Sequence, residues 1–144
     1  MTPVLDAAVF VAAISPVERQ HGRARALFEG HPLTAPDLVP GLFRGEVPAA
    51  LARRREPEEL LDAVDALVRG PRFHPCALDD ALLSESLRVA RTARLRAYDA
   101  VYVALALLRD EPLWTLDEEL STRGAACFPA LRAQEGGSAP PNSP

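Results

Sequence analysis

The sequence predicts an α/β protein, a three-layer α/β/α sandwich in which helices cover both faces of a central, mostly parallel sheet. Short apolar runs alternate with longer amphipathic stretches along most of the 144 residues. Hydrophobic residues make up 48% of the chain and charged residues 25%, which is close to the composition of an ordinary globular domain. Strands that alternate with helices in this way favour a parallel sheet with helices on both faces.

The short apolar runs are expected to form the strands of this sheet. They cover residues 3–6, 32–36, 72–78, 112–117 and 126–131. The carboxyl ends of parallel strands meet at one edge of a sheet, and ligands of such proteins bind at that edge.

The amphipathic stretches predict helices with recognisable ends. Pro16 and Gly30 bound one of them, Pro57 opens another that Gly70 closes, and Asp79 is the expected cap of the next. The predicted helices cover residues 7–15, 16–30, 37–55, 57–70, 79–94, 96–110 and 118–125, and the third is interrupted by Pro40, Gly41, Gly45 and Pro48.

The composition indicates one domain over residues 1–132, followed by a flexible tail over residues 133–144 that has no apolar run to bury. A net charge of −4 argues against a protein held to nucleic acid by bulk positive charge, although bound metal or local arginines reverse the field at a site. The sequence has neither a basic leader followed by an apolar segment nor a membrane-spanning run. We therefore expect a soluble cytoplasmic protein that does not contact a membrane.

The two cysteines and three histidines lack the spacing of a zinc site or a disulfide scaffold, so we expect none of them to take part in the chemistry. Exposed arginines have two interpretations: contacts to phosphates, or solvated surface charge, which is the commoner role. These arginines are Arg19, Arg23, Arg25 and the run at 53–55.

Four acidic residues stand where an active site of this fold would form. Asp6 and Asp117 each end a predicted strand at the carboxyl edge of the sheet, and Asp99 lies in the first turn of a helix that packs on the same sheet. Glu46 lies among apolar residues of the interrupted helix. Taken singly, the aspartates also read as helix caps and Glu46 as a solvated helix residue, and the spacing alone does not establish that the four converge.

Convergence would force a further conclusion. Two carboxylates about 4–5 Å apart repel by roughly 3–4 kcal/mol at an effective dielectric near 20, so a cluster holds protons or binds a cation. Oxygen ligands without His or Cys favour Mg²⁺ or Mn²⁺, which serve phosphoryl chemistry by activating water and stabilising the leaving oxygen.

Four segments, in this order, resemble the PIN-domain ribonucleases and in particular the VapC-type toxins: VLDAAVFVAAI, LTAPDLVPGLFRGEVPAAL, RAYDAVYVALALL and PLWTLDEEL. The resemblance covers roughly residues 3 to 130 and implies a PIN-like fold. It implies that Asp6, Glu46, Asp99 and Asp117 bind Mg²⁺ or Mn²⁺ and are the catalytic residues, and that Thr115 hydrogen-bonds and orients these acids. It further implies an RNA substrate, a homodimer and a cognate antitoxin protein.

Two departures from the family pattern bear on the site. Ala8 stands where many members carry Ser or Asn, which removes one polar contact near the acids. Pro48 follows Glu46 by two positions and Gly45 precedes it. Because proline breaks a helix interior at a cost of about 3 kcal/mol, we expect the helix to restart near Pro48 and to place Glu46 close to its N-terminus.

The principal hypothesis is therefore a metal-dependent endoribonuclease, the toxin of a type II toxin–antitoxin pair. A catalytically inactive PIN-like domain that binds protein or RNA is the alternative, since Ala8 and Pro48 depart from the pattern. A metal-dependent phosphatase or nucleotide hydrolase would use the same acids, but the sequence has no glycine-rich phosphate loop.

Overall fold

The computed structural model describes residues 2–31 and 36–134 and contains a five-stranded sheet in the order β3-β2-β1-β4-β5. Every neighbouring pair of strands is parallel, so the predicted α/β class and parallel sheet are confirmed. The strands are β1 (Val4–Leu5), β2 (Asp37–Pro40), β3 (Phe73–Cys76), β4 (Leu113–Trp114) and β5 (Ala133–Gln134).

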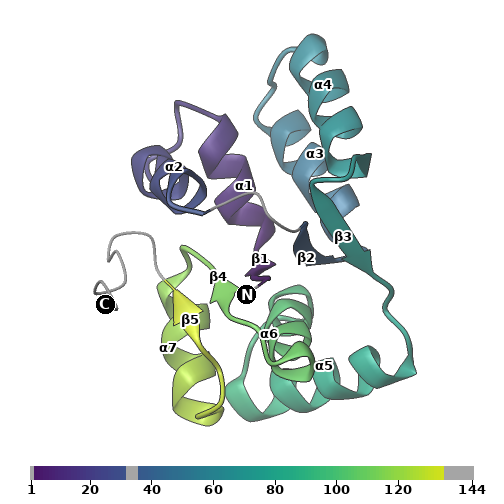
Figure 1. Cartoon of the computed structure of the whole chain (residues 1–144), viewed down its shortest axis with the longest axis vertical. Coiled ribbons are helices and arrows are strands. Elements are labelled where there is room, and N and C mark those ends of the chain that lie inside the picture. Colours follow the sequence, from purple (N-terminus) through teal and green to yellow (C-terminus); the bar gives the residue numbers. More distant parts are fainter. Residues whose placement is uncertain (1, 32–35, 135–144) are drawn as a thin grey trace.

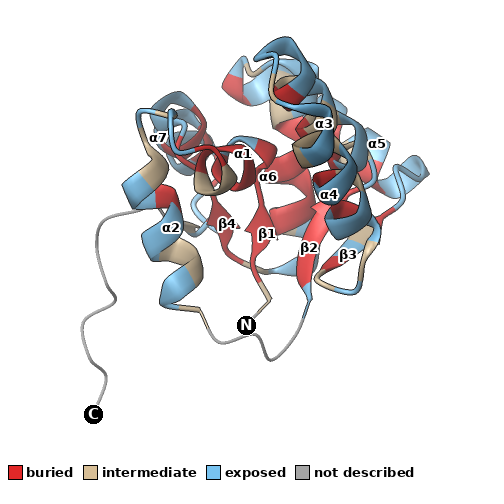
Figure 2. Cartoon of the chain, turned by 90° about the horizontal axis from the view of Figure 1, so that it is seen from above, coloured by how far each residue is buried: buried red, intermediate tan, exposed pale blue. Residues whose placement is uncertain are grey.

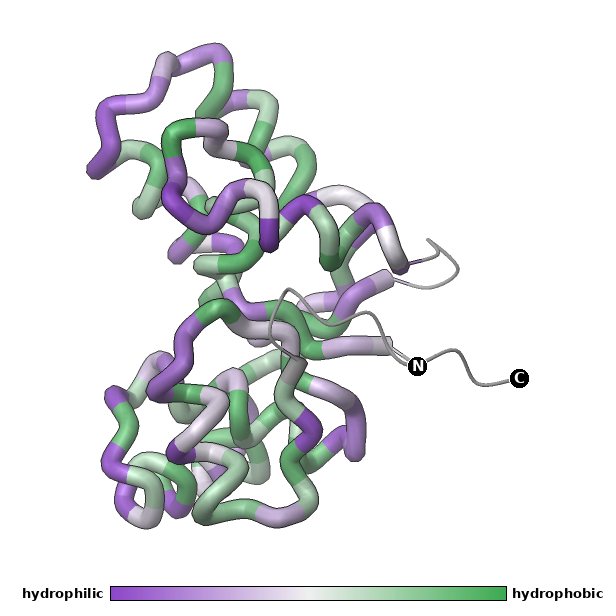
Figure 3. Tube along the Cα trace, turned by 90° about the vertical axis from the view of Figure 1, so that its left-hand side faces the viewer, coloured by the Kyte–Doolittle hydropathy of each residue, from purple (hydrophilic) through white to green (hydrophobic). Residues whose placement is uncertain are grey.

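The helices form one layer on each face of the sheet, which completes the predicted three-layer sandwich (Figure 1). The first layer holds α1 (Ala7–Ile14), α2 (His21–Glu29), α3 (Phe43–Arg53) and α4 (Glu58–Arg69). The second layer holds α5 (Asp80–Ala93), α6 (Ala97–Arg109) and α7 (Glu118–Cys127). A view from the side shows the two layers above and below the sheet (Figure 3).

The core is centred on β1 and on the two helices that cover it. Figure 2 shows the buried residues concentrated in β1, β2, β4, α1 and α6. Every residue from Ala100 to Ala106 is buried, because α6 contacts α5 on one side and the sheet on the other. A helix that is apolar on all sides is stable only in such an enclosed position. No helix in the described part of the chain is long and apolar enough to cross a membrane.

The predicted boundaries of the second strand and the third helix are wrong. Residues 37–40 form β2 rather than the start of a helix, and α3 begins at Phe43. Leu38 and Val39 are buried in the sheet between β1 and β3, a tertiary environment that overrides local helical preference. Residues 32–35 of the strand predicted at 32–36 lie outside the described residues.

Two further boundaries differ. The helix predicted from Pro16 begins at His21, because turns occupy the residues before it and the backbone N–H of Glu18 bonds to the carbonyl of Ser15. The last strand is β5 at 133–134 rather than 126–131, since α7 continues to Cys127. The first two residues of the predicted tail thus pair with β4, and residues 135–144 lie outside the described part.

The strand order places a crevice next to β1. After β1, the next two strands, β2 and β3, lie on one side of β1, and the last two, β4 and β5, lie on its other side. Helices leave β1 and β4 into opposite layers, and a ligand-binding crevice opens at such a switch point in parallel sheets. Asp6 follows β1 directly and Asp117 follows β4 by three residues.

Candidate metal centre

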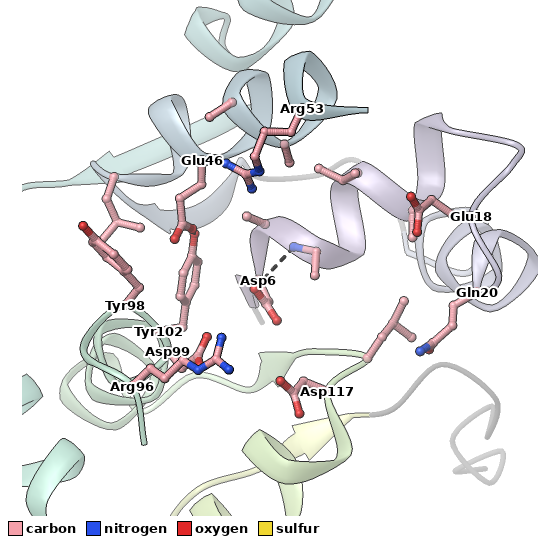
Figure 4. A pocket seen from close by; sticks show the side chains of 18 of the residues that line it. Asp6, Glu18, Gln20, Glu46, Arg53, Arg96, Tyr98, Asp99, Tyr102 and Asp117 are labelled. Atoms are coloured by element: carbon pink, nitrogen blue, oxygen red, sulfur yellow. Dashed lines mark hydrogen bonds between the residues drawn. The ribbon is translucent and has the colours of Figure 1, made fainter. Parts of the chain in front are cut away.

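The four acids predicted from the sequence line one hollow of about 1340 Å³ at the carboxyl edge of the sheet. They come from four different elements: the end of β1, the first turn of α3, the first turn of α6 and the N-terminus of α7. Figure 4 shows Asp6 between Glu46 and Asp99 on one side and Asp117 on the other. The fold therefore brings together residues that are up to 111 positions apart in the chain (from 6 to 117).

Asp6 lies deepest in this group and is only 8% exposed. Its Oδ1 accepts the backbone N–H of Ala8 at 3.4 Å, and its Oδ2 accepts the hydroxyl of Thr115 at 2.9 Å. Asp6 is therefore the N-cap of α1, as the capping interpretation predicted. Because a carboxylate offers about four acceptor positions, these two bonds leave it able to bind a cation as well.

Thr115 links the first and last of the four acids. Besides donating to Asp6, its Oγ1 accepts the backbone N–H of Asp117 at 3.0 Å. The Oδ1 of Asp117 caps α7 by accepting the backbone N–H groups of Glu119 and Leu120. The Thr115 hydroxyl, which is fully buried, thereby orients the side chain of one acid and the backbone of another.

Glu46 is half-buried, and its Oε2 accepts the hydroxyl of Tyr102 at 2.5 Å. The expectation that the helix restarts near Pro48 is wrong: α3 runs without a break from Phe43 to Arg53, with Pro48 inside it. Glu46 nevertheless lies in the first turn, as expected, because α3 begins at Phe43. Its side chain points into the hollow (Figure 4), so it is not a purely solvated helix residue.

Asp99 caps no helix, contrary to the capping interpretation. Arg96 is the N-cap of α6, and it makes no side-chain capping bond. The structure records no hydrogen bond between the Asp99 carboxylate and any other described residue. Asp99 lies in the first turn of α6, where its charge is favourable to the helix dipole, and its carboxylate oxygens have no hydrogen-bond partner in the described part of the chain that would prevent them from binding a cation in the hollow.

The four acids form one electrostatic group. Burial raises the pKa of Asp6 to about 6, and the charges of Asp99 and Glu46 add to that rise, while the Thr115 and Ala8 bonds oppose it. Burial also raises the pKa of Asp99, to which Asp117 adds, although Arg96 opposes the rise.

The pKa of Glu46 is raised as well, first by burial and then by Asp99. The Tyr102 bond and the charge of Arg53 oppose this rise. The pKa of Tyr102 is itself raised by burial and by the Glu46 charge, so its hydroxyl stays protonated and donates. All four acids are thus coupled, pair by pair, through Asp99.

The residues present fit a hard divalent cation by their chemistry. The donors are carboxylate oxygens, which Mg²⁺ and Mn²⁺ prefer. Among the described residues, no Lys, Arg or His side chain lowers the pKa of the buried Asp6 carboxyl. As the side chains stand, no three His, Cys, Asp or Glu residues in the described part lie close enough to hold one ion. Binding would therefore require the carboxylates to rotate inward, and Asp99 has no recorded hydrogen bond that opposes this.

Sequence reasoning missed two residues of this hollow, Tyr102 and Arg96, whereas Arg53 belongs to the arginine run at 53–55, for which phosphate contact was one of two interpretations. Tyr102 reads as an ordinary apolar position of α6, yet it donates to Glu46. Arg53 and Arg96 line the hollow beside the acids, where they oppose the pKa rise of Glu46 and Asp99 respectively. The spacing of Tyr102, three residues after Asp99, was a usable signal, since such residues share a helix face.

A family model described as the PIN domain matches residues 4–125, and the chain therefore belongs to the PIN domain family. No curated protein sequence is significantly similar to it.

Solved structures share the fold at low sequence identity. VapC20 from Mycobacterium tuberculosis, a toxin that cleaves the sarcin–ricin loop, has a TM-score of 0.72 at 17% identity and covers 85% of this chain and 95% of its own. FitAcB from Neisseria gonorrhoeae has a TM-score of 0.71 at 14% identity, with 92% and 96% covered. A toxin–antitoxin complex from Klebsiella pneumoniae has a TM-score of 0.64 at 17% identity, with 90% and 95% covered.

Proposed function

We propose that this protein is a Mg²⁺- or Mn²⁺-dependent endoribonuclease and the toxin of a type II toxin–antitoxin pair. The observation that carries the proposal is that four carboxylates line one hollow, where the buried Asp6 is coupled to Glu46 and Asp99, and Asp99 is coupled to Asp117. Burial and the mutual repulsion of these like charges cost the fold free energy. A bound divalent cation offsets that cost and supplies a reason for the arrangement.

The chain's own residues have distinct tasks in this reaction. Asp6, Glu46, Asp99 and Asp117 would hold the cation, which supplies an activated water and charge neutralisation at the phosphate. Thr115 keeps the Asp6 carboxylate directed at the hollow, and Tyr102 does the same for Glu46. In-line attack by water on an RNA phosphodiester then yields a 5′-phosphate and a 3′-hydroxyl.

The direct test replaces the acid that has no structural bond. Asp99→Asn is expected to abolish Mg²⁺-dependent cleavage of RNA while leaving the thermal unfolding midpoint nearly unchanged. Asp62→Asn is the matched control, because Asp62 is exposed on α4 and does not line the hollow. Undiminished cleavage by Asp99→Asn would overturn the assignment of this residue.

The alternative is an inactive PIN-like module that binds protein or RNA without a cation, and the absence of three ligands in contact among the described residues favours it. Calorimetric titration with Mn²⁺ separates the two functions. The ribonuclease binds Mn²⁺ in a manner that Asp6→Asn and Asp99→Asn both weaken. The inactive module shows no binding that depends on either residue.

The proposed partners are a cognate antitoxin and a second copy of the chain. Support comes from fold relatives that were solved as toxin–antitoxin complexes, including VapBC2 from Rickettsia felis bound to a DNA fragment from its promoter. Expression of the chain alone is expected to arrest growth, and co-expression of a small protein encoded beside it is expected to relieve the arrest. Sedimentation equilibrium of the purified chain tests the homodimer.

A further inference from the structure

Tyr98 is the one exposed aromatic residue of this protein. The chain has eight Phe, Tyr and Trp residues, all within the described part. Seven of them are buried or partly buried, whereas Tyr98 is 66% exposed. Exposing an aromatic ring to water forgoes the free energy that its burial would contribute, so its location on the surface is informative.

That location is the rim of the acidic hollow. Tyr98 lies in the first turn of α6, next to Asp99, and lines the hollow. Tyr102 follows by four residues and therefore shares its face of the helix. Tyr102 is only 1% exposed and bonds to Glu46, so one ring lies beneath the acids and the other stands at the edge. Figure 4 shows both rings on the same side of the hollow.

Two arginines flank the same part of the hollow. Arg53 on α3 and Arg96 at the start of α6 both line it and are exposed. The structure records no salt bridge for either of them with any other described residue. Arg54, by contrast, is paired with Glu18. In Figure 4, Arg53 lies on the Glu46 side and Arg96 on the Asp99 side, so positive charge is available on both flanks of the acids.

We propose that Tyr98 is a stacking platform for the base of one unpaired nucleotide beside the scissile phosphate, and that Arg53 and Arg96 contact the phosphates on either side. This inference rests on the proposed ribonuclease function. An exposed aromatic ring combined with flanking cations is the arrangement that binds single-stranded nucleic acid. A base within a duplex is stacked on both faces by its neighbours and cannot lie on Tyr98, so the site selects unpaired RNA.

The test measures steady-state cleavage of a short single-stranded oligoribonucleotide by the full chain with Mg²⁺. Tyr98→Ala is expected to raise KM about tenfold or more, the usual effect of losing one base–aromatic stack, while kcat changes less than about twofold. Tyr98→Phe keeps the ring and is expected to stay within about threefold of the wild-type KM. Leu108→Ala is the matched control, since Leu108 is 49% exposed on the same helix and does not line the hollow.

A series of substrates with one abasic position locates the stacked base. At one position in the substrate, removal of the base is expected to raise the KM of the wild type to the KM that Tyr98→Ala shows with the intact substrate. The KM of Tyr98→Ala is expected to be the same for the intact substrate and for this abasic one. The inference is overturned if Tyr98→Ala leaves KM unchanged. It is also overturned if the KM of Tyr98→Ala stays about tenfold above that of the wild type with every abasic substrate. A third contrary outcome is that Tyr98→Ala raises KM because the substitution dissociates a dimer. Absence of cleavage by the wild-type chain would instead overturn the proposed function itself.

Discussion

The hydroxyl of Thr115 donates a hydrogen bond of 2.9 Å to Oδ2 of Asp6 across 109 positions of sequence. The two residues meet because β1 and β4 pair in parallel, with Leu5 opposite Trp114. Each residue directly follows its strand, so the pairing brings both to the same edge of the sheet. The bond ties the deepest acid of the hollow to the segment that carries Asp117.

Thr115→Val is expected to weaken both the fold and the proposed metal site. Valine has nearly the shape of threonine but no hydroxyl, so Asp6 loses a donor and the Asp117 N–H loses its acceptor. Leaving buried polar groups unpaired costs about 1–3 kcal/mol, which urea denaturation measures. Calorimetry is expected to show weaker Mn²⁺ binding. Thr115→Ser keeps the hydroxyl and is the control; equal Mn²⁺ affinity in the valine variant would contradict the orienting role.

Asp6→Asn is expected to stabilise the metal-free protein above pH 6. The pKa of Asp6 rises from an ordinary 3.8 to about 6 on folding, so the folded state binds the proton more tightly than the unfolded state. Stability therefore falls as the pH rises from about 4 to about 6, by up to about 3 kcal/mol in total. Asparagine carries no charge and still caps α1, so it removes this loss.

Urea unfolding of the wild type and of Asp6→Asn at two pH values tests whether the charge of Asp6 destabilises the metal-free protein. At pH 7.5 in EDTA, Asp6→Asn is expected to unfold at higher urea than the wild type, and at pH 3.5 the two curves are expected to coincide. Added Mg²⁺ is expected to stabilise only the wild type, because only the wild type retains the full set of ligands. A variant that is less stable than the wild type at pH 7.5 in EDTA would refute the electrostatic argument.

Tyr102→Phe is expected to lower Mn²⁺ affinity or cleavage rate by about 10- to 100-fold, the usual effect of losing a bond that orients a metal ligand. The variant keeps the buried ring but removes the donor to Oε2 of Glu46. Thermal unfolding in EDTA monitors the fold, and only a small change in midpoint is expected. If Tyr102→Phe cleaved RNA at the wild-type rate, Glu46 would not need the Tyr102 hydrogen bond to bind the cation.

A second buried charge lies at the opposite edge of the sheet. Asp37, the first residue of β2, is fully buried, with Arg72 Nη2 at 2.9 Å from one carboxylate oxygen and His31 Nε2 at 3.6 Å from the other. Burial raises the pKa of Asp37, and the charges of Arg72 and His31 oppose the rise. These contacts join the starts of β2 and β3 to the end of α2.

Arg72→Met is expected to destabilise the protein by about 3–5 kcal/mol at pH 7, because it leaves the Asp37 charge buried and uncompensated. Since burial favours the protonated carboxyl, the loss is expected to shrink as the pH falls. Asp37→Asn combined with Arg72→Met is expected to recover most of the stability. Arg69→Met removes an exposed pair with Asp65 and is the control, with an expected cost below about 1 kcal/mol.

Much of the fold follows from local pattern. The helix α4 was predicted to within one residue at each end, because Pro57 and Gly70 bound an amphipathic stretch with an unambiguous period. The strand β2 was misread as helix, since its short run between prolines carries no period of its own. Its extended conformation depends on pairing with β1 and β3, which are distant in the sequence.

The sequence by itself determined the alternation of strands and helices, and with it the positions of Asp6 and Asp117 after two strands and of Asp99 in a first helical turn. These features depend on side-chain periodicity and on end signals, which act over a few residues. Only the tertiary structure decided that the four acids share one hollow, that Tyr102 bonds to Glu46, and that Tyr98 remains exposed at the rim. Those relationships depend on the strand order and on the packing of α3 against α1 and of α6 against the sheet, and such long-range contacts leave no local pattern in the chain.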